Sequence, residues 1–509
     1  MPGHPFTIPD LLARNAILYP DETAVVSEEE RLTFKALEEQ SSRCAAGLAA
    51  RGVSPGDRIA VLSDSSSAFL VLLGGTAIIG AIVVLINSRL GDEEMAYILR
   101  DTKAGWLAVG PGYVEQSRRM ASQASFPLKR LVLGDKGDGD AMAWGDLLQT
   151  DVETPPGPGT ADSPYLIIHT AASGGRPRGA ILTQANLLAC GIQIASMLAI
   201  VREDCQIGLL PLFHIGGLAM TTAVLLHGGK NVLVPRFVPA IARQCIARER
   251  GTFFVTFPPM LAALLDEQEK SGNGMPSLRL VAGVDSAETI ERFLRINPKA
   301  TFCSLYGQTE AMPVSGGLFR ESPGSIGRPA LLTRVALHDD LDREVPPGLI
   351  GEICVRSPAV FQGYWNLTSD TARALRNGWH HTGDLGRMDE KGFLWYAGRK
   401  PEKELIKSGG ENVYPAEVEQ VLLAHGAVAE ASVIGVADPD WGEAVLAVCV
   451  TVPGRRVEAE ELVAFVASRI ARYKKPKFIL FTDTLPKTAS GTVDREAVKR
   501  IWGDAHVRS

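Results

Sequence analysis

The stretch that decides the fold is Tyr165-Leu-Ile-Ile-His-Thr-Ala-Ala-Ser-Gly-Gly-Arg-Pro-Arg-Gly179. A short apolar strand leads into a loop of hydroxyl side chains, glycines and two arginines. Glycine lets the backbone approach a ligand, N–H groups and hydroxyls donate to phosphate oxygens, and arginines offset charge. The stretch therefore predicts a polyphosphate site at a strand end, although it lacks the common P-loop pattern. A Gly-rich surface turn with two solvated arginines is the alternative.

Strand and helix patterns alternate on both sides of this stretch, from about residue 22 to residue 333. Strands are predicted at 59–63, 105–109, 130–133, 165–168, 231–234, 252–256 and 278–282. Helices are predicted at 34–51, 92–101, 184–198, 240–250 and 259–270. Such alternation predicts an α/β fold with mostly parallel sheets covered by helices on both faces, and the number of strands requires two sheets.

The pattern changes twice in the last third of the chain. Between about residues 324 and 397, short strands separated by Gly and Pro turns predict a small antiparallel subdomain resembling a β-barrel. A charged, proline-containing segment begins at residue 398, and a new α+β pattern follows it. We therefore expect a large N-terminal domain at 1–398 and a smaller C-terminal domain at 399–509, joined near 399–404.

Composition excludes several functional classes. The chain has 509 residues, 46% of them hydrophobic and 22% charged, with a net charge of −6. This balance gives no reason to expect nucleic acid or an anionic membrane as a partner. The seven cysteines include no Cys-x-x-Cys pair, which favours a reducing, cytoplasmic compartment.

One uncharged stretch, residues 68–86, is nearly long enough to span a membrane. Gly74-Gly75 and Gly80 divide it, however, into a helix and a β-branched strand. We therefore expect a helix that leads into a buried parallel strand, and no membrane span. The N-terminus shows no basic segment followed by an apolar one, so no signal peptide is expected.

Three further motifs carry candidate chemistry. Leu305-Tyr-Gly-Gln-Thr-Glu310 offers a ring for stacking, a hydroxyl for phosphate and a carboxylate for Mg²⁺. His381-Thr-Gly-Asp-Leu385 places an Asp at a predicted tight turn, where it can hold a ribose diol. Gly398-Arg399 is followed by the charged run Glu404–Glu419. Singly, each also fits a strand-end turn, an Asx-turn or a linker before a helix.

Together and in this order, the four motifs resemble the adenylate-forming enzymes, which include acyl-CoA synthetases, luciferases and the adenylation domains of peptide synthetases. The resemblance covers about residues 7–499. Within that group, the chain looks most like acyl-CoA synthetases, on the residues Pro211–Gly217, Asp438–Glu443 and Ser408–Pro415. The resemblance implies attack of a carboxylate on the α-phosphate of ATP to give acyl-AMP, and then displacement of AMP by the CoA thiol. It also implies a C-terminal domain that rotates between the two half-reactions.

The resemblance assigns roles to individual residues. Those expected to contact the phosphates are Thr170, Ser173, Gly174, Gly175, Arg178, Gly179 and Thr309, with Glu310 as the Mg²⁺ ligand. Those expected around adenine are Gly283, Val284, Asp285, Tyr306, Gly307 and Gln308, and Asp384 with Arg399 is expected at the ribose. His214 is expected where the acyl and CoA pockets meet, with an ordinary structural histidine as the alternative. Lys403 is expected at the hinge, and Lys407, Ser408, Gly409 and Gly410 at the pantetheine tunnel.

The chain departs from the family pattern in two places. In the phosphate loop, Ala171 and Ala172 replace Ser and Gly, and Arg178 replaces Lys. Position 492 is Thr where the family has a catalytic Lys. The loss of a cation directed at the charge that develops in the transition state lowers the adenylation rate on the order of 10²–10³-fold. Lys487 is the nearest candidate substitute, with a solvated loop lysine as the alternative.

We therefore expect an acyl-CoA synthetase that uses ATP, CoA and Mg²⁺ and has an altered first step. The alternatives are an adenylate- or nucleotide-binding homologue with weak adenylation activity, or a ligase that loads a separate carrier protein. The predicted acyl-pocket walls, 213–217, 257–260, 282–285 and 308–313, are mostly apolar and contain no Lys or Arg. They favour a medium-chain aliphatic or an aromatic acid over acetate. The sequence leaves the oligomeric state open, a homodimer included.

Overall fold

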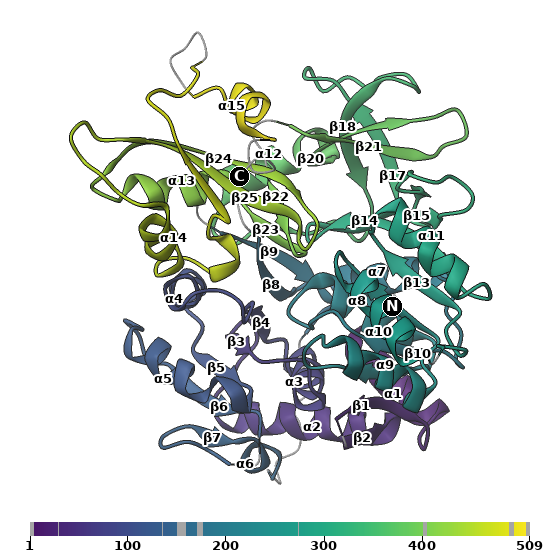
Figure 1. The fold of residues 1–509 in the computed structure, drawn as a ribbon. Coiled ribbons are helices and arrows are strands. Elements are labelled where there is room, and N and C mark those ends of the chain that lie inside the picture. The colour runs from purple at the N-terminus through teal and green to yellow at the C-terminus, as the bar shows by residue number, and fades with distance from the viewer. Residues whose placement is uncertain are drawn as a thin grey trace.

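The structure, a computed structural model, describes residues 5–28, 30–134, 136–149, 159–170, 177–272, 274–400, 405–487 and 493–504. Two large sheets and a small sheet form the N-terminal part, and a separate α+β unit follows it, drawn in yellow-green in Figure 1. The predicted fold class is confirmed.

The first large sheet has nine strands in the order β16-β15-β14-β13-β12-β10-β11-β1-β2. The strands from β14 to β1 in this order run parallel, and antiparallel strands close both edges. Their bounds are β1 (Thr23–Ser27), β2 (Glu30–Thr33), β10 (Cys205–Gly208), β11 (Lys230–Leu233), β12 (Phe253–Thr256), β13 (Leu280–Gly283), β14 (Thr301–Gln308), β15 (Ala311–Leu318) and β16 (Arg328–Pro329).

The second large sheet has eight strands in the order β19-β9-β8-β4-β3-β5-β6-β7, with a parallel part from β8 to β7. In chain order, its strands are β3 (Arg58–Leu62), β4 (Ile82–Leu85), β5 (Trp106–Val109), β6 (Lys129–Val132), β7 (Met142–Ala143), β8 (Pro164–Thr170), β9 (Arg178–Thr183) and β19 (Gly363–Tyr364). The predicted strand at 165–168 is therefore the core of β8.

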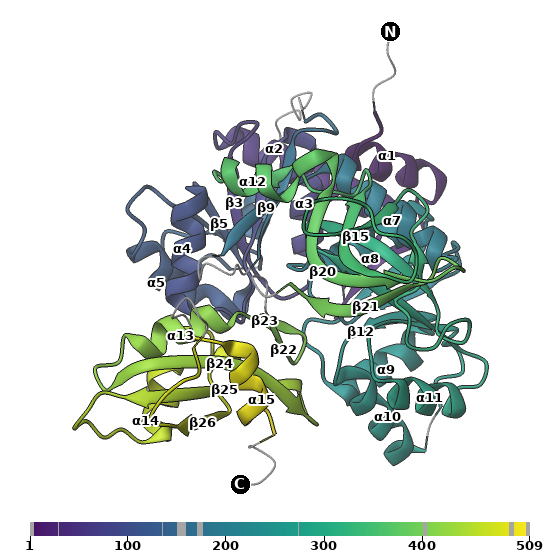
Figure 2. The ribbon, with the colours of Figure 1, turned by 90° about the horizontal axis from the view of Figure 1, so that it is seen from above.

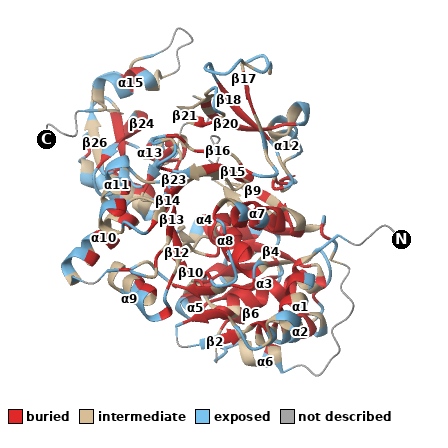
Figure 3. Cartoon of the chain, turned by 90° about the vertical axis from the view of Figure 1, so that its right-hand side faces the viewer, coloured by how far each residue is buried: buried red, intermediate tan, exposed pale blue. Residues whose placement is uncertain are grey.

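Helices fill three layers around these sheets. The layer between the sheets shares one hydrophobic core with both and contains α1 (Ile8–Leu18), α2 (Phe34–Ala50), α3 (Ser67–Ile79), α7 (Gln184–Met197) and α8 (Ile215–Leu226). Outside the nine-stranded sheet lie α9 (Pro239–Glu249), α10 (Met260–Ser271) and α11 (Ala287–Ile296). Outside the other lie α4 (Asp92–Thr102) and α5 (Val114–Ser122), beyond the buried strands that Figure 3 shows in red. The predicted alternation of strands and helices is confirmed.

The uncharged stretch at 68–86 is a helix followed by a strand, as predicted. Gly80 ends α3 with a φ of +70°, a conformation that favours glycine. In β4, Val83 and Leu85 face the shared core while Ile82 and Val84 face α4 and α5, so both faces are buried. Among the described residues, no helix is long and apolar enough to cross a membrane.

The small antiparallel subdomain is an open sheet of four strands in the order β17-β18-β20-β21. Its strands are β17 (Arg334–His338), β18 (Ile350–Arg356), β20 (His380–Met388) and β21 (Leu394–Arg399), and the helix α12 (Thr368–Ala374) lies beside them. Asp384, predicted at a tight turn, lies instead within β20. A short helix, α6 (Trp144–Leu148), and the 3₁₀ turns η1 (Pro111–Tyr113) and η2 (Arg376–Gly378) complete the N-terminal part.

The C-terminal unit is a five-stranded sheet with helices on both faces. Its elements are β22 (Ile406–Ser408), β23 (Glu411–Val413), α13 (Pro415–Leu423), β24 (Val428–Asp438), β25 (Gly442–Thr451), α14 (Ala459–Ala467), η4 (Arg472–Lys474), β26 (Phe478–Phe481) and α15 (Arg495–Trp502). The β22–β23 hairpin points towards the middle of the molecule (Figure 2).

Candidate active site

Glu310 lies in the turn between β14 and β15, and its residue is only 8% exposed. Its Oε1 accepts hydrogen bonds from the Thr170 hydroxyl at 3.2 Å and the Tyr364 hydroxyl at 2.9 Å. Thr170 ends β8, so this contact joins the two large sheets at the carboxyl ends of their strands, where α/β folds bind ligands. A carboxylate with neighbouring hydroxyls is an oxygen donor set, and it fits Mg²⁺.

Arg178 supplies positive charge beside this carboxylate. It begins β9 and pairs with Thr170 across the strands. Its guanidinium lies 4.2 Å above the Tyr364 ring, and its NH1 donates to Asp370 at 3.0 Å. The residue is thus held at the edge of the phosphate loop, whose predicted contacts Ser173, Gly174 and Gly175 lie outside the described residues.

Asp384 is the centre of a second cluster, 3% exposed. One oxygen accepts from Arg399 at 2.9 Å, and the other accepts from Tyr306 and Gln308, both at 2.7 Å. The structure therefore brings together four of the residues predicted at the adenosine. Burial and the Asp384 charge raise the pKa of the Tyr306 phenol well above its usual range, which keeps it a hydrogen-bond donor.

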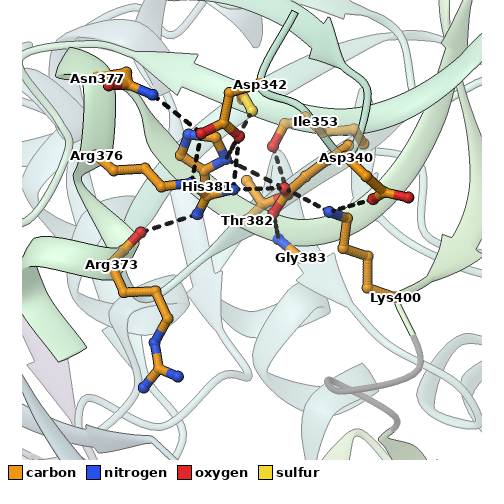
Figure 4. Close-up of polar contacts among 12 residues, drawn as sticks. Asp340, Asp342, Ile353, Arg373, Arg376, Asn377, His381, Thr382, Gly383 and Lys400 are labelled. Carbon is orange, nitrogen blue, oxygen red and sulfur yellow. Dashed lines mark hydrogen bonds and ion pairs between the residues drawn. The ribbon is translucent and has the colours of Figure 1, made fainter.

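Glu352, on β18, holds the Asp384 strand in place and was not predicted from the sequence. Its carboxylate accepts from the Gly383 N–H at 2.8 Å and contacts His381, Lys400 and Arg376. Figure 4 labels these four partners of the carboxylate. Burial alone would raise the pKa of Glu352. Because His381 and Lys400 stabilise its charge, that pKa is instead lowered to about 2. This buried anion contacts Gly383 and His381, on the stretch of β20 that leads to Asp384.

A buried group of His338, Cys354 and His381 lies next to Glu352 and has metal-ligating side chains. The Cys354 thiol is 3.3 Å from His381 Nδ1, which also lies 3.2 Å from Glu352. Burial raises the pKa of the thiol, so it is not a ready thiolate ligand. These contacts indicate a structural role for the group.

The predicted adenine segment lies at the end of β13. A Cβ on Gly283 would lie 2.0 Å from the Thr256 carbonyl oxygen, so the close approach of β12 and β13 requires glycine. Val284 is 42% exposed. Burial raises the pKa of Asp285. Gly307 and Thr309 lie on the neighbouring β14 and its turn, so all these residues share one edge of the sheet.

His214 and the β22–β23 hairpin meet across the interface between the two parts of the chain. His214 caps α8, and its Nε2 is 3.6 Å from the Glu411 carboxylate. Glu411 also accepts from Asn87 at 3.0 Å and Arg89 at 2.6 Å. Burial alone would raise the pKa of Glu411, but His214 and Arg89 lower it to about 2. Glu411 and Arg89 were not predicted, because they are 322 residues apart.

Gly409 and Gly410 form the turn of this hairpin, with φ values of +57° and +82°. A Cβ on Gly409 would lie 2.5 Å from the Trp441 ring, and one on Gly410 would lie 3.7 Å from the Phe257 Cβ. Glycine is therefore required in this turn, which lies against a predicted acyl-pocket wall. Ser408 is buried at the end of β22, and the Lys407 N–H donates to Glu443 at 2.6 Å.

Lys487, the candidate substitute for the family's catalytic lysine, has its partner within the C-terminal unit. Lys487 donates to Glu430 on β24 at 2.9 Å and is half-exposed. Lys403 and Thr492 lie outside the described residues. The contact of Arg399 with the Leu405 carbonyl, at 3.1 Å, spans the predicted hinge.

The chain matches two models of protein families. The model of the AMP-binding enzyme matches residues 12–365, and that of the AMP-binding enzyme C-terminal domain matches residues 417–492. The chain belongs to the AMP-binding enzyme family. It is an ATP-dependent acid–thiol ligase of the AMP-forming class.

Two curated members of the AMP-binding family match almost end to end. The feruloyl-CoA synthase of an Amycolatopsis species is 36% identical over 498 residues, covering 96% of this chain and 98% of the relative. The indoleacetate–CoA ligase of Aromatoleum aromaticum is 34% identical over 500 residues, covering 96% of each.

One solved AMP-binding enzyme, the o-succinylbenzoate CoA synthetase of Bacillus subtilis, matches differently in two complexes. A double mutant bound to a product analogue gives a TM-score of 0.85 at 30% identity, covering 97% of this chain and 98% of the other. The complex with the acyl-adenylate intermediate gives 0.70, at 30% identity, with 96% and 98% covered. Because identity and coverage are nearly equal, the difference reflects how the parts of each chain are arranged.

Proposed function

We propose that this enzyme converts an aromatic carboxylic acid to its CoA thioester through an acyl-adenylate. The observation that carries the proposal is the Gly409–Gly410 turn, which lies beside Phe257 in a predicted wall of the acyl pocket. We propose that the thiol arm of CoA approaches the acyl group along this turn, and that the nucleotide lies at the buried carboxylates Glu310 and Asp384.

In the first half-reaction, a carboxylate oxygen attacks the α-phosphorus, and the bond to pyrophosphate breaks. Thr170 and Arg178 bind and orient the phosphates, and Asp384 orients the ribose through its hydroxyls. Glu310 would hold Mg²⁺, which would supply positive charge to neutralise the phosphates. Negative charge develops on phosphate oxygens, so the positions of these groups determine the rate.

In the second half-reaction, the CoA sulfur attacks the acyl carbon, AMP leaves, and the thiol proton is released. Ser408, Gly409 and Gly410 leave room for the pantetheine arm. We propose that His214, whose Nε2 lies 3.6 Å from the Glu411 carboxylate, receives the proton.

The acid class rests on the pocket walls and on the relatives. The runs around Phe257, Gly216 and Met312 are apolar, and a Cβ on Gly216 would lie 3.2 Å from Leu210 and 4.0 Å from Met312. Glycine at 216 therefore widens the pocket, which favours a bulky ring over a short chain. The relatives described above are named for ferulate, indoleacetate and o-succinylbenzoate, which all carry an aromatic ring.

A panel of ferulate, indole-3-acetate, 2-succinylbenzoate and octanoate tests the proposal. With ATP, Mg²⁺ and CoA, we expect AMP and thioester to form in equal amounts with at least one aromatic acid, faster than with octanoate. Pyrophosphate release at background with every acid, despite measurable ATP binding, would contradict it.

Thr492 favours a second candidate, a protein that binds acyl-adenylate and forms it only slowly. The residue offers no cation where the family has its catalytic lysine. This candidate predicts CoA-dependent consumption of supplied feruloyl adenylate together with pyrophosphate release near background. Equal rates for the two half-reactions would exclude it.

A further inference from the structure

A buried ionic cluster crosses the interface between the N-terminal part and the C-terminal unit. Glu94, in the first turn of α4, accepts from Lys474 Nζ at 2.5 Å and from the Ala471 N–H at 2.8 Å. Lys474 bonds to Oε1 of Glu94, whereas Oε2 accepts from Ala471 and also from the Gly91 N–H at 2.8 Å. Both views show α4 against the C-terminal unit (Figures 1 and 2).

Lys474 connects this contact to the body of the C-terminal unit. Its side chain is 2% exposed and donates a second bond, at 2.7 Å, to Glu417 on α13. Burial alone would lower the pKa of Lys474, but the carboxylates of Glu417 and Glu94 raise it. Glu417 and Lys474 belong to the same unit, so only the bonds to Glu94 cross the interface.

A second ionic contact lies at the other end of the same short segment. Arg89 binds Glu411, which directly follows the Gly409–Gly410 turn. The segment from Asn87 to Glu94 thus holds the C-terminal unit at two points, Glu411 and Lys474. A rigid unit held at two points can turn only about the line that joins them, so these contacts restrict where the glycine turn lies.

The comparison with the Bacillus subtilis enzyme indicates which step this orientation serves. The chain matches the product-analogue complex at a TM-score of 0.85 and the adenylate complex at 0.70. Lys487, in contrast, is bonded to Glu430 within its own unit. The described orientation therefore resembles the one that accompanies a CoA-type ligand.

We propose that Glu94, through Lys474 and the Ala471 N–H, is a positioning residue for thioester formation. It fixes the C-terminal unit so that Gly409 and Gly410 line the path of the thiol, and it takes no part in adenylation. This inference rests on the proposed function for its kinetic test, but its structural test needs no substrate.

Glu94→Gln removes the charge and one of the two acceptor oxygens and leaves Lys474 with Glu417 alone. We expect consumption of supplied feruloyl adenylate by CoA to slow by roughly 10- to 100-fold. Pyrophosphate exchange should change by less than about twofold, which also shows that the fold is intact. Glu94→Asp, which keeps the charge, should restore part of the lost rate.

Glu417→Gln is the matched control, since it removes a carboxylate from the same cluster but leaves the bonds from Lys474 and the Ala471 N–H to Glu94 across the interface. It should leave both half-reactions close to wild type. If Glu417→Gln and Glu94→Gln slow the thioester step equally, the cluster is merely structural and the proposal fails.

A distance measurement separates this inference from the proposed reaction. Nitroxide labels at Ser122→Cys and Ser468→Cys, both exposed, report the orientation in a Cys245→Ser background, because the other six cysteines are buried. Pulsed electron paramagnetic resonance should show one dominant distance in this labelled protein and in Glu417→Gln. Glu94→Gln should broaden or shift it. An unchanged distribution in Glu94→Gln would overturn the inference whether or not ferulate is a substrate.

Discussion

The residues proposed to bind the nucleotide and those proposed to line the path of the thiol differ in how they are held. Around Asp384, the contacts from Tyr306, Gln308 and Arg399 all come from the N-terminal part. On the thiol side, Glu411 and Lys474 come from the C-terminal unit and reach residues on the segment 87–94. The first side is thus built into one body, whereas the second exists only when two bodies meet.

This difference separates the two half-reactions. Side chains fixed within one unit remain in place whatever the orientation of the other unit, so the nucleotide side is preorganised. A few charged contacts across an interface can break and form again. Such contacts suit a set of residues proposed to assemble for only one of the two half-reactions. Substitutions on the two sides should therefore affect different steps.

Glu310→Gln should have the largest effect, because it removes the carboxylate charge expected to hold Mg²⁺. We expect pyrophosphate exchange to fall on the order of 10²–10³-fold, while CoA still consumes supplied feruloyl adenylate at close to the wild-type rate. Both rates can be measured on one preparation. Equal loss of the two rates would break the comparison, since Glu310 would then serve both sides.

Asp384→Asn should have an intermediate effect on nucleotide binding. It removes the charge that Arg399 and Tyr306 share, so we expect AMP affinity by calorimetry to fall roughly 10- to 100-fold. Tyr306→Phe keeps the ring and removes one hydrogen bond, so its loss should be about fivefold. An Asp384→Asn variant with wild-type AMP affinity would show that the ribose binds elsewhere.

Glu352→Gln should affect stability more than chemistry, by about 3 kcal/mol at pH 7, because a buried charge cluster loses its anion. The pKa of Glu352 is lowered to about 2, below its ordinary value of about 4.3. Its stabilisation is therefore complete above the ordinary pKa and is lost as pH falls towards 2. Urea unfolding at pH 7 and pH 3 should show a smaller difference between variant and wild type at pH 3. A difference that does not change with pH would contradict the assignment.

The sequence was sufficient for what depends on local pattern. The strand at 165–168 and the helix–strand pair in 68–86 follow from apolar periodicity. The strand that carries Asp384 was missed because Gly383, with a φ of +70°, gives its sequence the character of a turn. The interface contacts were missed for a different reason. Glu94 and Lys474 are 380 residues apart and belong to no motif, so only the packed structure brings them together.

The most direct test of the account compares the two half-reactions in one enzyme, with ferulate and with feruloyl adenylate. We predict that CoA consumes the adenylate faster than the enzyme forms it, because the thiol side is assembled and Thr492 leaves the adenylation step without its lysine. Thr492→Lys should then raise pyrophosphate release by about tenfold or more, and in that background Lys487→Ala should have no effect. Adenylation at least as fast as thioester formation, with no gain from Thr492→Lys, would contradict the account.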